Sequence, residues 1–237
     1  MPRKSLFILF FVLSLSSLVS AQKHFSIRAK MTYDYFSAED LKTTQSQIVE
    51  YFWKYNIPAK ALQSFPPHYG LQVQFLIPVN DSLGVNAGVY FEQMSTGGRV
   101  HYKDYSGEEK FDQVLQAQAF GVMGEKNFRL NRFFSFNLNF GLSLISVSYN
   151  IKTYEQIYNY SKSDEIGVSN FTLGASPGVG LSFQLYNFYI SGNAGFQFCL
   201  PSGFQYNGQT LKNSVNGDAI KPGLDGFRLA AGLGFYL

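Results

Sequence analysis

The sequence predicts an all-β protein: an eight-stranded antiparallel up-and-down transmembrane β-barrel. Three observations support this prediction. Apolar and polar residues alternate with a period of two in eight separate runs, as they do in strands whose successive side chains point to opposite faces. The polar face of these runs consists mostly of Gly, Ser, Asn, Gln and Thr. Short and long connections alternate between the runs, which is typical of membrane barrels.

The runs have the length that a membrane strand needs. Strands of about ten residues, at ~3.3 Å per residue and tilted by ~45°, cross the ~25 Å apolar band of an outer membrane. In the fourth run, we assign the apolar face to Leu115, Ala117, Ala119 and Met123. The eight runs span residues 24–36, 70–79, 84–93, 113–124, 133–144, 171–185, 188–198 and 226–237.

Composition indicates which face meets lipid. Rows of Phe, Leu, Val and Ile pointed inward from eight strands would overfill a lumen that is only just wide enough for side chains. A soluble lipocalin-like barrel, the alternative with the same period, would carry Lys and Glu on its polar face. We therefore expect the apolar rows to face lipid and the small polar residues to fill the lumen. Aromatic residues near the ends of the runs would form the girdles: Tyr33, Tyr35, Tyr149, Phe188 and Tyr236.

The connections divide into three short turns and four long loops. The short turns lie at Asn80–Ser82, about residues 125–131, and Tyr186–Asn187, so we expect one rim to carry these turns and both termini. The long loops span about residues 37–69, 95–112, 149–170 and 201–225, at the opposite rim. Pro177 cannot donate to a ladder, so we expect a bulge there or a strand that begins at Gly178.

The first long loop contains a predicted short helix. Ser37 and Asp40 resemble a capping box, and Pro58 ends the helical pattern. The apolar residues at helical spacing are Leu41, Ile48, Phe52 and Tyr55. The helix would cover the barrel mouth; a plug and an amphipathic helix lying on the membrane surface are the alternatives.

Two segments make up the chain. Residues 1–21 have Arg3 and Lys4, an apolar core and the small-residue pattern Val19-Ser20-Ala21, which predicts a secretory signal peptide cut after Ala21. Residues 22–237 form the predicted barrel domain. The single Cys199 excludes an intramolecular disulfide. A net charge of +3 without a Lys/Arg cluster does not favour nucleic-acid binding.

The sequence also resembles a known family. The eight-strand plan and the closing run "GFRLAAGLGFYL" are similar to the small outer-membrane β-barrels of Gram-negative bacteria. The segments "YGLQVQFLIPVNDSLGVNAGVYFEQMSTGG" and "SPGVGLSFQLYNFYISGNAGFQF" resemble the OMP β-barrel domain family of Bacteroidetes, the PorT-like group. The resemblance covers nearly all of the mature chain and implies an outer-membrane location. It also implies that barrel-assembly machinery reads the C-terminal Phe235, Tyr236 and Leu237, although such barrels often end in Phe.

Few charged residues lie on the polar faces, and they are the candidate site. If the barrel closes, the first and last strands are neighbours, and antiparallel pairing brings Asp34 near Arg228. Glu92 is then expected to face Arg28 or Lys30. An unpaired charge in a narrow lumen is costly, so we expect a luminal ion-pair network, either structural or acting as a gate or selectivity ring.

The sequence favours a non-enzymatic protein without cofactors. No catalytic or metal site is predicted: His24 and Ser26 have the His-x-Ser spacing of lipid A deacylases but lie at the wrong rim, and His68 and His101 have no helix-spaced partner. We expect a structural or binding barrel with surface-exposed loops and at most a narrow pore. Its expected partners are outer-membrane lipid, barrel-assembly machinery and an envelope protein. The alternatives are a component of a secretion or envelope-assembly machine, which the resemblance allows, an outer-leaflet lipid-modifying enzyme and a secreted lipocalin-like binder.

Overall fold

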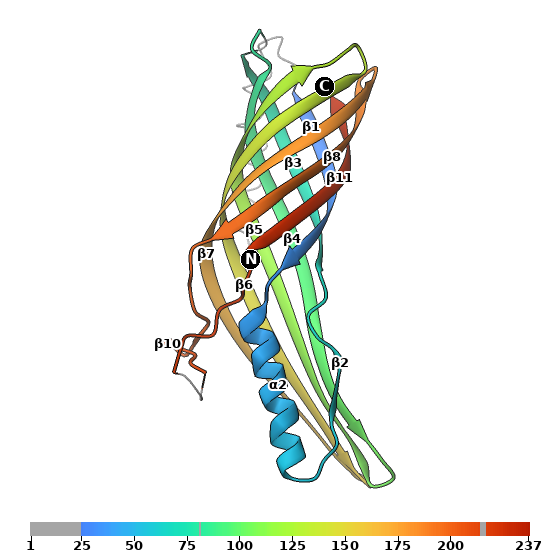
Figure 1. Ribbon diagram of the computed structural model, residues 1–237, viewed down its shortest axis with the longest axis vertical. Coiled ribbons are helices and arrows are strands. Elements are labelled where there is room, and N and C mark those ends of the chain that lie inside the picture. The colour runs from blue at the N-terminus through green and yellow to red at the C-terminus, as the bar shows by residue number, and fades with distance from the viewer. Residues whose placement is uncertain (1–24, 81, 214–216) are drawn as a thin grey trace, which may run out of the picture.

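The computed structural model describes residues 25–80, 82–213 and 217–237 and shows a barrel that continues into a long extension at one end (Figure 1). The predicted eight-strand antiparallel ring is confirmed, with β7 closing on β8. The predicted signal peptide and His24 lie outside the described residues. In ring order the strands are β1 (Ser26–Phe36), β3 (His68–Asn80), β4 (Val85–Lys103), β5 (Gly107–Arg129), β6 (Phe134–Ile157), β7 (Tyr160–Leu185), β8 (Phe188–Cys199) and β11 (Gly226–Tyr236).

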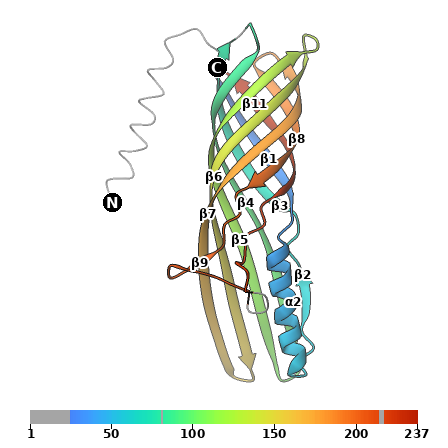
Figure 2. The ribbon, with the colours of Figure 1, turned by 60° about the vertical axis from the view of Figure 1, so that its left-hand side comes forward.

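Four smaller elements lie at the extended end of the molecule (Figure 2). They are α2 (Glu39–Lys54), β2 (Lys60–Gln63), β9 (Gln205–Tyr206) and β10 (Gln209–Thr210). Among the described residues, no helix has the length and apolar character needed to cross a membrane.

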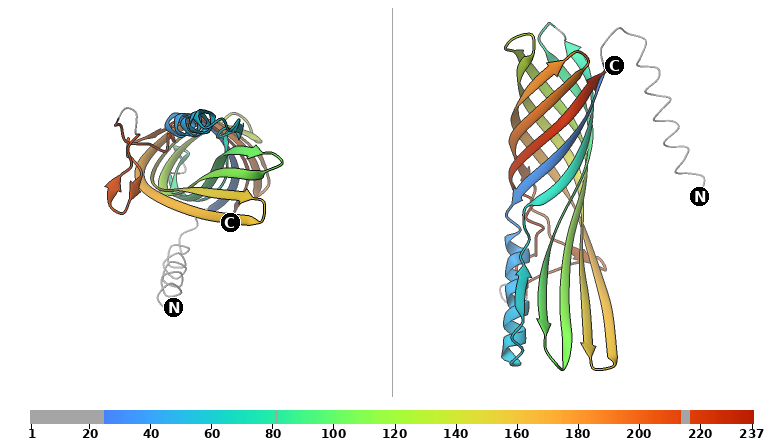
Figure 3. Two further views of the ribbon diagram at one scale, coloured as in Figure 1. Left: turned by 90° about the horizontal axis from the view of Figure 1, so that it is seen from below. Right: turned by 90° about the vertical axis from the view of Figure 1, so that its right-hand side faces the viewer.

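The last strand closes the barrel. β11 pairs with β1 along its whole length, from Ser26 opposite Tyr236 to Phe36 opposite Gly226. On its other side β11 pairs with β8, so neither edge of the C-terminal strand is left unpaired (Figure 3). Closure matters because a bilayer offers no water to satisfy unpaired backbone groups. The chain therefore ends in a regular strand because that strand joins β1 to β8 and closes the ring.

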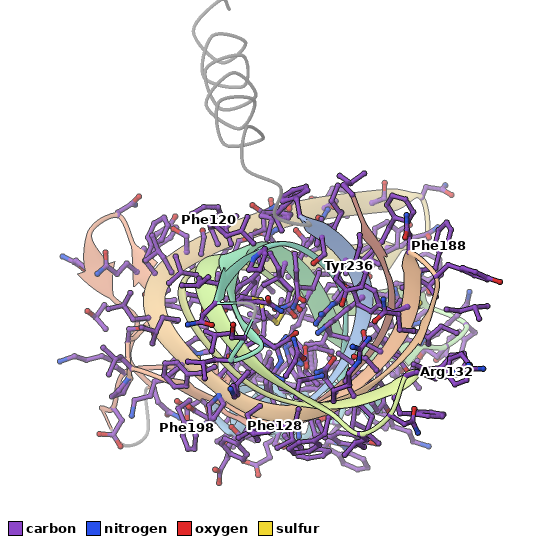
Figure 4. The ribbon with its side chains drawn as sticks, turned by 90° about the horizontal axis from the view of Figure 1, so that it is seen from above. Phe120, Phe128, Arg132, Phe188, Phe198 and Tyr236 are labelled. Atoms are coloured by element: carbon purple, nitrogen blue, oxygen red, sulfur yellow. The ribbon has the colours of Figure 1, made fainter. Side chains whose placement is uncertain are left out.

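The outside of the ring is apolar, as predicted. Phe120, Phe128, Phe188 and Phe198 lie on its outer side in Figure 4. Leu142, Leu144, Leu181 and Ile190 are half-exposed or more on the same face. Tyr33, Tyr35 and Tyr69 cluster on the outside of β1 and β3, with ring centroids 4.9 Å apart for two of the pairs. Such a belt with aromatic residues at its end is suited to lipid contact.

The apolar side of the sheet changes at one level of the structure. On β6 the outward residues are apolar up to Leu144 and then become Ser146 and Ser148. The inward residues change the opposite way, from Ser143 to the fully buried Ile145. The outward row becomes polar at opposed positions on the two neighbouring strands, since Gln93 lies opposite Gln118 and Gln118 lies opposite Ser146. On β7 the change falls two residues further toward the blade, because Phe171, opposite Ser146, is still an exposed apolar residue and Ser169 is the first polar one. On the barrel side of this level the strands have an apolar outer face and a polar lumen. On the side of the long extension they have a polar outer face and an apolar inner face.

Two of the four long loops are therefore strands, which corrects the prediction. β4 and β5 run on to a turn at residues 104–106, and β6 and β7 run on to a turn at Tyr158–Asn159. We call the part of this sheet beyond the change of face the blade: residues 93–103, 107–118, 145–157 and 160–170. The period of two continues through these segments, but with the apolar parity reversed. Loops were predicted because the outward apolar row stops.

Three face assignments are wrong, and the reversed parity explains those of Leu115, Ala117 and Tyr149. Leu115, Ala117, Ala119 and Met123 were expected to face lipid, but they point inward, and Phe120 and Val122 are the outward residues. Tyr149 is no girdle residue: it is 3% exposed and stacks on Phe204 in the interior of the blade. Tyr236 points into the lumen beside Tyr189, at 4.8 Å between ring centroids.

The predicted helix in the first loop is present as α2. Leu41 and Phe52 are buried, and the Phe52 ring lies 5.3 Å from that of Phe111 on the blade. Tyr55, expected on the same face, is 63% exposed. The predicted capping box is wrong, because Ala38 is the N-cap residue in a left-handed conformation and makes no side-chain cap bond. Asp40 instead accepts a bond from the backbone N–H of Lys221.

Pro177 is accommodated without a bulge, which differs from both expected solutions. β7 continues through Pro177 and pairs with Phe140 of β6 there. The ladder from β7 to β8 is interrupted at Ser176 and Pro177 and resumes in the same register at Gly178. Pro177 has no backbone N–H, and it lies where β7 makes no ladder bond to β8, so no hydrogen bond is lost there.

We predict that the level at which the apolar face changes is the membrane surface. In a Cys199→Ser background, a spin label at Leu142→Cys should be relaxed by oxygen dissolved in lipid. A label at Ser148→Cys should be relaxed by a water-soluble paramagnetic complex. Electron paramagnetic resonance in vesicles measures both accessibilities. Equal water accessibility at the two positions would contradict the assignment.

Candidate functional site

Arg228 of β11 forms a charged cluster with residues from three other strands, in the part of the lumen nearest the blade. Its Nε lies 2.9 Å from Asp34 Oδ1 of β1, the residue directly opposite in the ladder. Its guanidinium also contacts Glu92 of β4 and Gln197 of β8. Asp34 and Glu92 are completely buried. The cluster links β11 to strands on the far side of the lumen as well as to its neighbours.

Arg28 forms a second cluster nearer the short-turn rim. Its two terminal nitrogens donate to both oxygens of Glu125 on β5, at 2.8 and 3.2 Å. Its Nε donates to the hydroxyl of Tyr189 at 3.0 Å, and Asn127 donates to the same carboxylate at 3.0 Å. This bidentate geometry is the strong form of an ion pair. It joins β1 to β5 across the lumen.

The partners of two predicted residues differ from expectation. Glu92 was expected to face Arg28 or Lys30, but it pairs with Arg228 and also accepts a bond from Gln72 at 3.1 Å. Lys30 is 4% exposed and makes no ion pair within 4 Å among the described residues. It lies between the two clusters on the wall of a cavity of about 70 Å³. Among the described residues, the acids Asp34, Glu92 and Glu125 equal in number the cations Arg28, Lys30 and Arg228 in the lumen.

Sequence reasoning missed Glu125. It was placed in the short link after the fourth run, whose faces had been assigned the wrong way round. Glu125 has the same parity as Met123, and both side chains point into the lumen. The signal that could have found it is Phe120 and Val122, which continue the lipid-facing row of the neighbouring strands.

Glycines make room for the bulky luminal side chains. A Cβ atom on Gly234 would lie 2.1 Å from Tyr189 Cζ, and one on Gly121 would lie 2.6 Å from Tyr90 Cε1. These rings and the two ion-pair clusters occupy the cross-section of the lumen. The expectation of a narrow interior filled by side chains therefore has a direct structural basis.

The outer end of the lumen is covered by an apolar cap. Ala38, the N-cap residue, and Leu41 of α2, with Phe65, Phe204 and Leu224, pack on the inward residues of the blade. These inward residues are Met94, Leu115, Ala117, Ile145, Val147, Tyr149 and Val168. Two segments of the cap, the one that follows β1 and the one that precedes β11, are joined to each other by backbone bonds from the Ser37 N–H to Asp225 and from the Ala38 N–H to Gly223. A polar lumen thus ends against a small hydrophobic core.

The outer surface of the blade is polar, with exposed aromatic residues at its far end. Tyr105 at the β4–β5 turn and Tyr158 at the β6–β7 turn are 94% and 71% exposed. Asp104 holds the first turn, because hydrogen bonds from the Tyr102 hydroxyl and from Ser106 lower the pKa of its carboxyl to about 2. This turn therefore remains bonded at any neutral or mildly acidic pH.

The histidines form no catalytic arrangement among the described residues. His68 is buried against Phe36, and neither ring nitrogen has a partner. His101 contacts Glu108 across the β4–β5 hairpin at 3.0 Å. Ser26 is buried near the short-turn rim. No group of three or more His, Cys, Asp or Glu residues in the described part of the chain is placed to hold a metal ion.

The sequence matches no protein-family model and no curated protein. Among solved structures, the chain is similar to Neisserial surface protein A (NspA), with 11% identity, a TM-score of 0.39, and 89% of this chain and 96% of that chain covered. It is also similar to Ail, the attachment invasion locus protein of Yersinia pestis, solved with the heparin analogue sucrose octasulfate. There the identity is 12%, the TM-score is 0.38, and the coverage is 92% of this chain and 100% of that chain. Likenesses this distant assign neither a family nor a function.

We predict that removing Arg228 destabilises the barrel strongly. Arg228→Met leaves Asp34 and Glu92 buried without a cation, which costs about 3–5 kcal/mol in comparable cases. Urea unfolding in lipid vesicles, followed by Trp53 fluorescence, measures the loss. The matched control is Arg99→Ala, which breaks the exposed Arg99–Asp112 pair and should cost about 0–1 kcal/mol. Equal losses for the two variants would contradict a structural role of the luminal cluster.

Proposed function

We propose that the protein is an integral outer-membrane barrel without enzymatic activity that holds a rigid binding blade outside the cell. The observation that carries this proposal is the change of apolar face at one level of the sheet. On the barrel side of that level the apolar outer face suits a bilayer. On the blade side the same strands have a polar outer face and enclose a core of their own. In such barrels the short turns face the periplasm, so the blade would face the exterior.

The barrel serves as an anchor in this proposal, and its lumen does not serve as a general pore. The Arg28 and Arg228 clusters cross the lumen, and the apolar cap covers its outer end. An eight-strand barrel has little room to spare even without these features. The luminal network is then a structural device that holds opposite walls together, and a gating role has no separate support.

The structure supports the three alternative functions to different degrees. A soluble lipocalin-like binder conflicts with the exposed apolar belt, because monomeric soluble proteins rarely expose apolar patches of that extent. A lipid-modifying enzyme needs a base beside a nucleophile, and neither His68 nor His101 hydrogen-bonds to a Ser, Thr or Cys among the described residues. Participation in a secretion or assembly machine is compatible with the blade as a docking surface. Membership of the PorT-like group, cleavage of the signal peptide and recognition of Phe235, Tyr236 and Leu237 by assembly machinery stay predictions.

We predict that the inserted barrel conducts no steady current. Planar bilayers containing the heat-modifiable, folded protein should stay at baseline, because the lumen is blocked by side chains at two levels and capped at a third. A general porin added to the same bilayer is the positive control. Reproducible conductance steps from the folded protein alone would contradict a sealed lumen.

We also predict that the blade is accessible from outside intact cells. An epitope tag inserted between Asp104 and Ser106, at the exposed β4–β5 turn, should bind antibody without permeabilisation. A tag inserted between Leu130 and Arg132, at a short turn on the opposite rim, should bind only after the outer membrane is opened. The reverse pattern would overturn the proposed orientation.

A further inference from the structure

The two edges of the blade are treated differently by the fold. On one side, β2 pairs with β4, so Arg99, Val100 and His101 have partners. On the other side, β7 has β6 as its partner, and β9 joins only at Ser169. Between the turn at Tyr158 and this contact, residues 160–168 of β7 pair with no strand on their outer side among the described residues. An open edge of this length presents unpaired backbone N–H and C=O groups to another strand.

The sequence of this open edge is complementary to itself. It reads Tyr160-Ser161-Lys162-Ser163-Asp164-Glu165-Ile166 and is exposed throughout. If two copies pair antiparallel about Ser163, Lys162 of each lies opposite Asp164 of the other. Tyr160 then lies opposite Ile166, an aromatic and a β-branched residue. Both kinds of cross-strand pair stabilise sheets.

Symmetry restricts the possible registers. Directly opposed residues share a face of the sheet, so two identical strands related by a two-fold axis through the sheet must pair residues of the same parity. Moving the axis by one residue toward Lys162 places Lys162 opposite itself, and moving it toward Asp164 places Asp164 opposite itself. Of these three neighbouring registers, only the one centred on Ser163 sets opposite charges against each other. That centre is also close to the middle of the open stretch between the turn and β9.

The direction of pairing identifies where the second copy sits. The blade strands run along the long axis of the molecule, away from the barrel (Figures 1 and 3). Copies in one membrane point the same way, so their β7 edges would run parallel. An antiparallel pair needs the second barrel to point in the opposite direction, and therefore to sit in an opposing membrane.

We propose that the β7 edge of the blade, at Tyr160–Ile166, is a self-recognition surface that joins two copies from opposing membranes. The inference rests on the proposed exposure of the blade outside the cell. Lys162 and Asp164 now pair within one chain at 2.7 Å, and both are more than half exposed, so they are free to exchange partners. A seven-residue strand edge buries a small area, so each contact is weak, and many copies acting together hold the membranes.

Vesicle clustering tests the proposal with charge reversals. The purified full chain, reconstituted into lipid vesicles, should cluster them, as read by light scattering. Lys162→Glu places Glu opposite Asp164, and Asp164→Lys places Lys opposite Lys162, so each variant alone should cluster about tenfold more slowly or not at all. A mixture of the two vesicle populations restores both opposite-charge pairs and should cluster at close to the wild-type rate. Lys60→Glu on β2 makes the same charge change at the opposite, covered edge of the blade and should have no effect.

The outcomes separate this inference from the proposed function. Antibody binding to the β4–β5 tag on the same vesicles reports whether the blade is exposed. Vesicles with an exposed blade that do not cluster overturn the self-recognition surface alone. Clustering that both single variants retain, or that the mixture fails to restore, also overturns it. Faster clustering by Lys162→Glu would show that Lys162 instead guards the edge against pairing.

Discussion

The structure depends on one constraint: an antiparallel sheet has two faces, and its apolar face must meet lipid inside a membrane and a protein core outside it. Long strands that cross the membrane surface must therefore exchange their apolar face at that surface. Here the exchange occurs between Leu144 and Ile145 on β6, at opposing positions on β4 and β5, and within two residues of the opposing position on β7. No bulge is needed, because the residue types change while the side-chain period continues.

The other features follow from this exchange. On the barrel side, the charged residues in the polar lumen of an eight-strand ring must pair with one another. This explains the ion pairs of Arg28 with Glu125 and of Arg228 with Asp34 and Glu92. On the blade side, the inward apolar face of the open four-strand sheet must be covered by other residues to be shielded from water. The loop containing α2 and the segment around Phe204 and Leu224 supply that cover. The cap is thus required by the blade's own core, and closing the lumen is its consequence.

Sequence reasoning predicted what the period of two and the composition determine. It found the ring, the closing strand, the lipid-facing rows and the helix after Ser37, and it placed Asp34 opposite Arg228. It failed where parity alone was ambiguous. The run around Leu115 is apolar on its inward face on the blade side of the change and on its outward face on the barrel side, so either assignment fitted a ten-residue window. That error hid Glu125 and turned two long hairpins into loops. The N-cap of α2 was missed because Ala38 is fixed by tertiary contacts with Gly223.

Closing a barrel removes its edges, but a sheet that outgrows the barrel regains them. In this chain the ring has none, while the blade has two, at β4 and at β7. The chain covers the β4 edge with β2 and leaves the β7 edge open over residues that are charged, exposed and self-complementary. Charged residues on an edge usually prevent pairing, because an arbitrary partner strand leaves them unmatched. An edge whose charges match only a copy of itself in one register discourages other partners and still permits one, which is the condition for specific self-recognition.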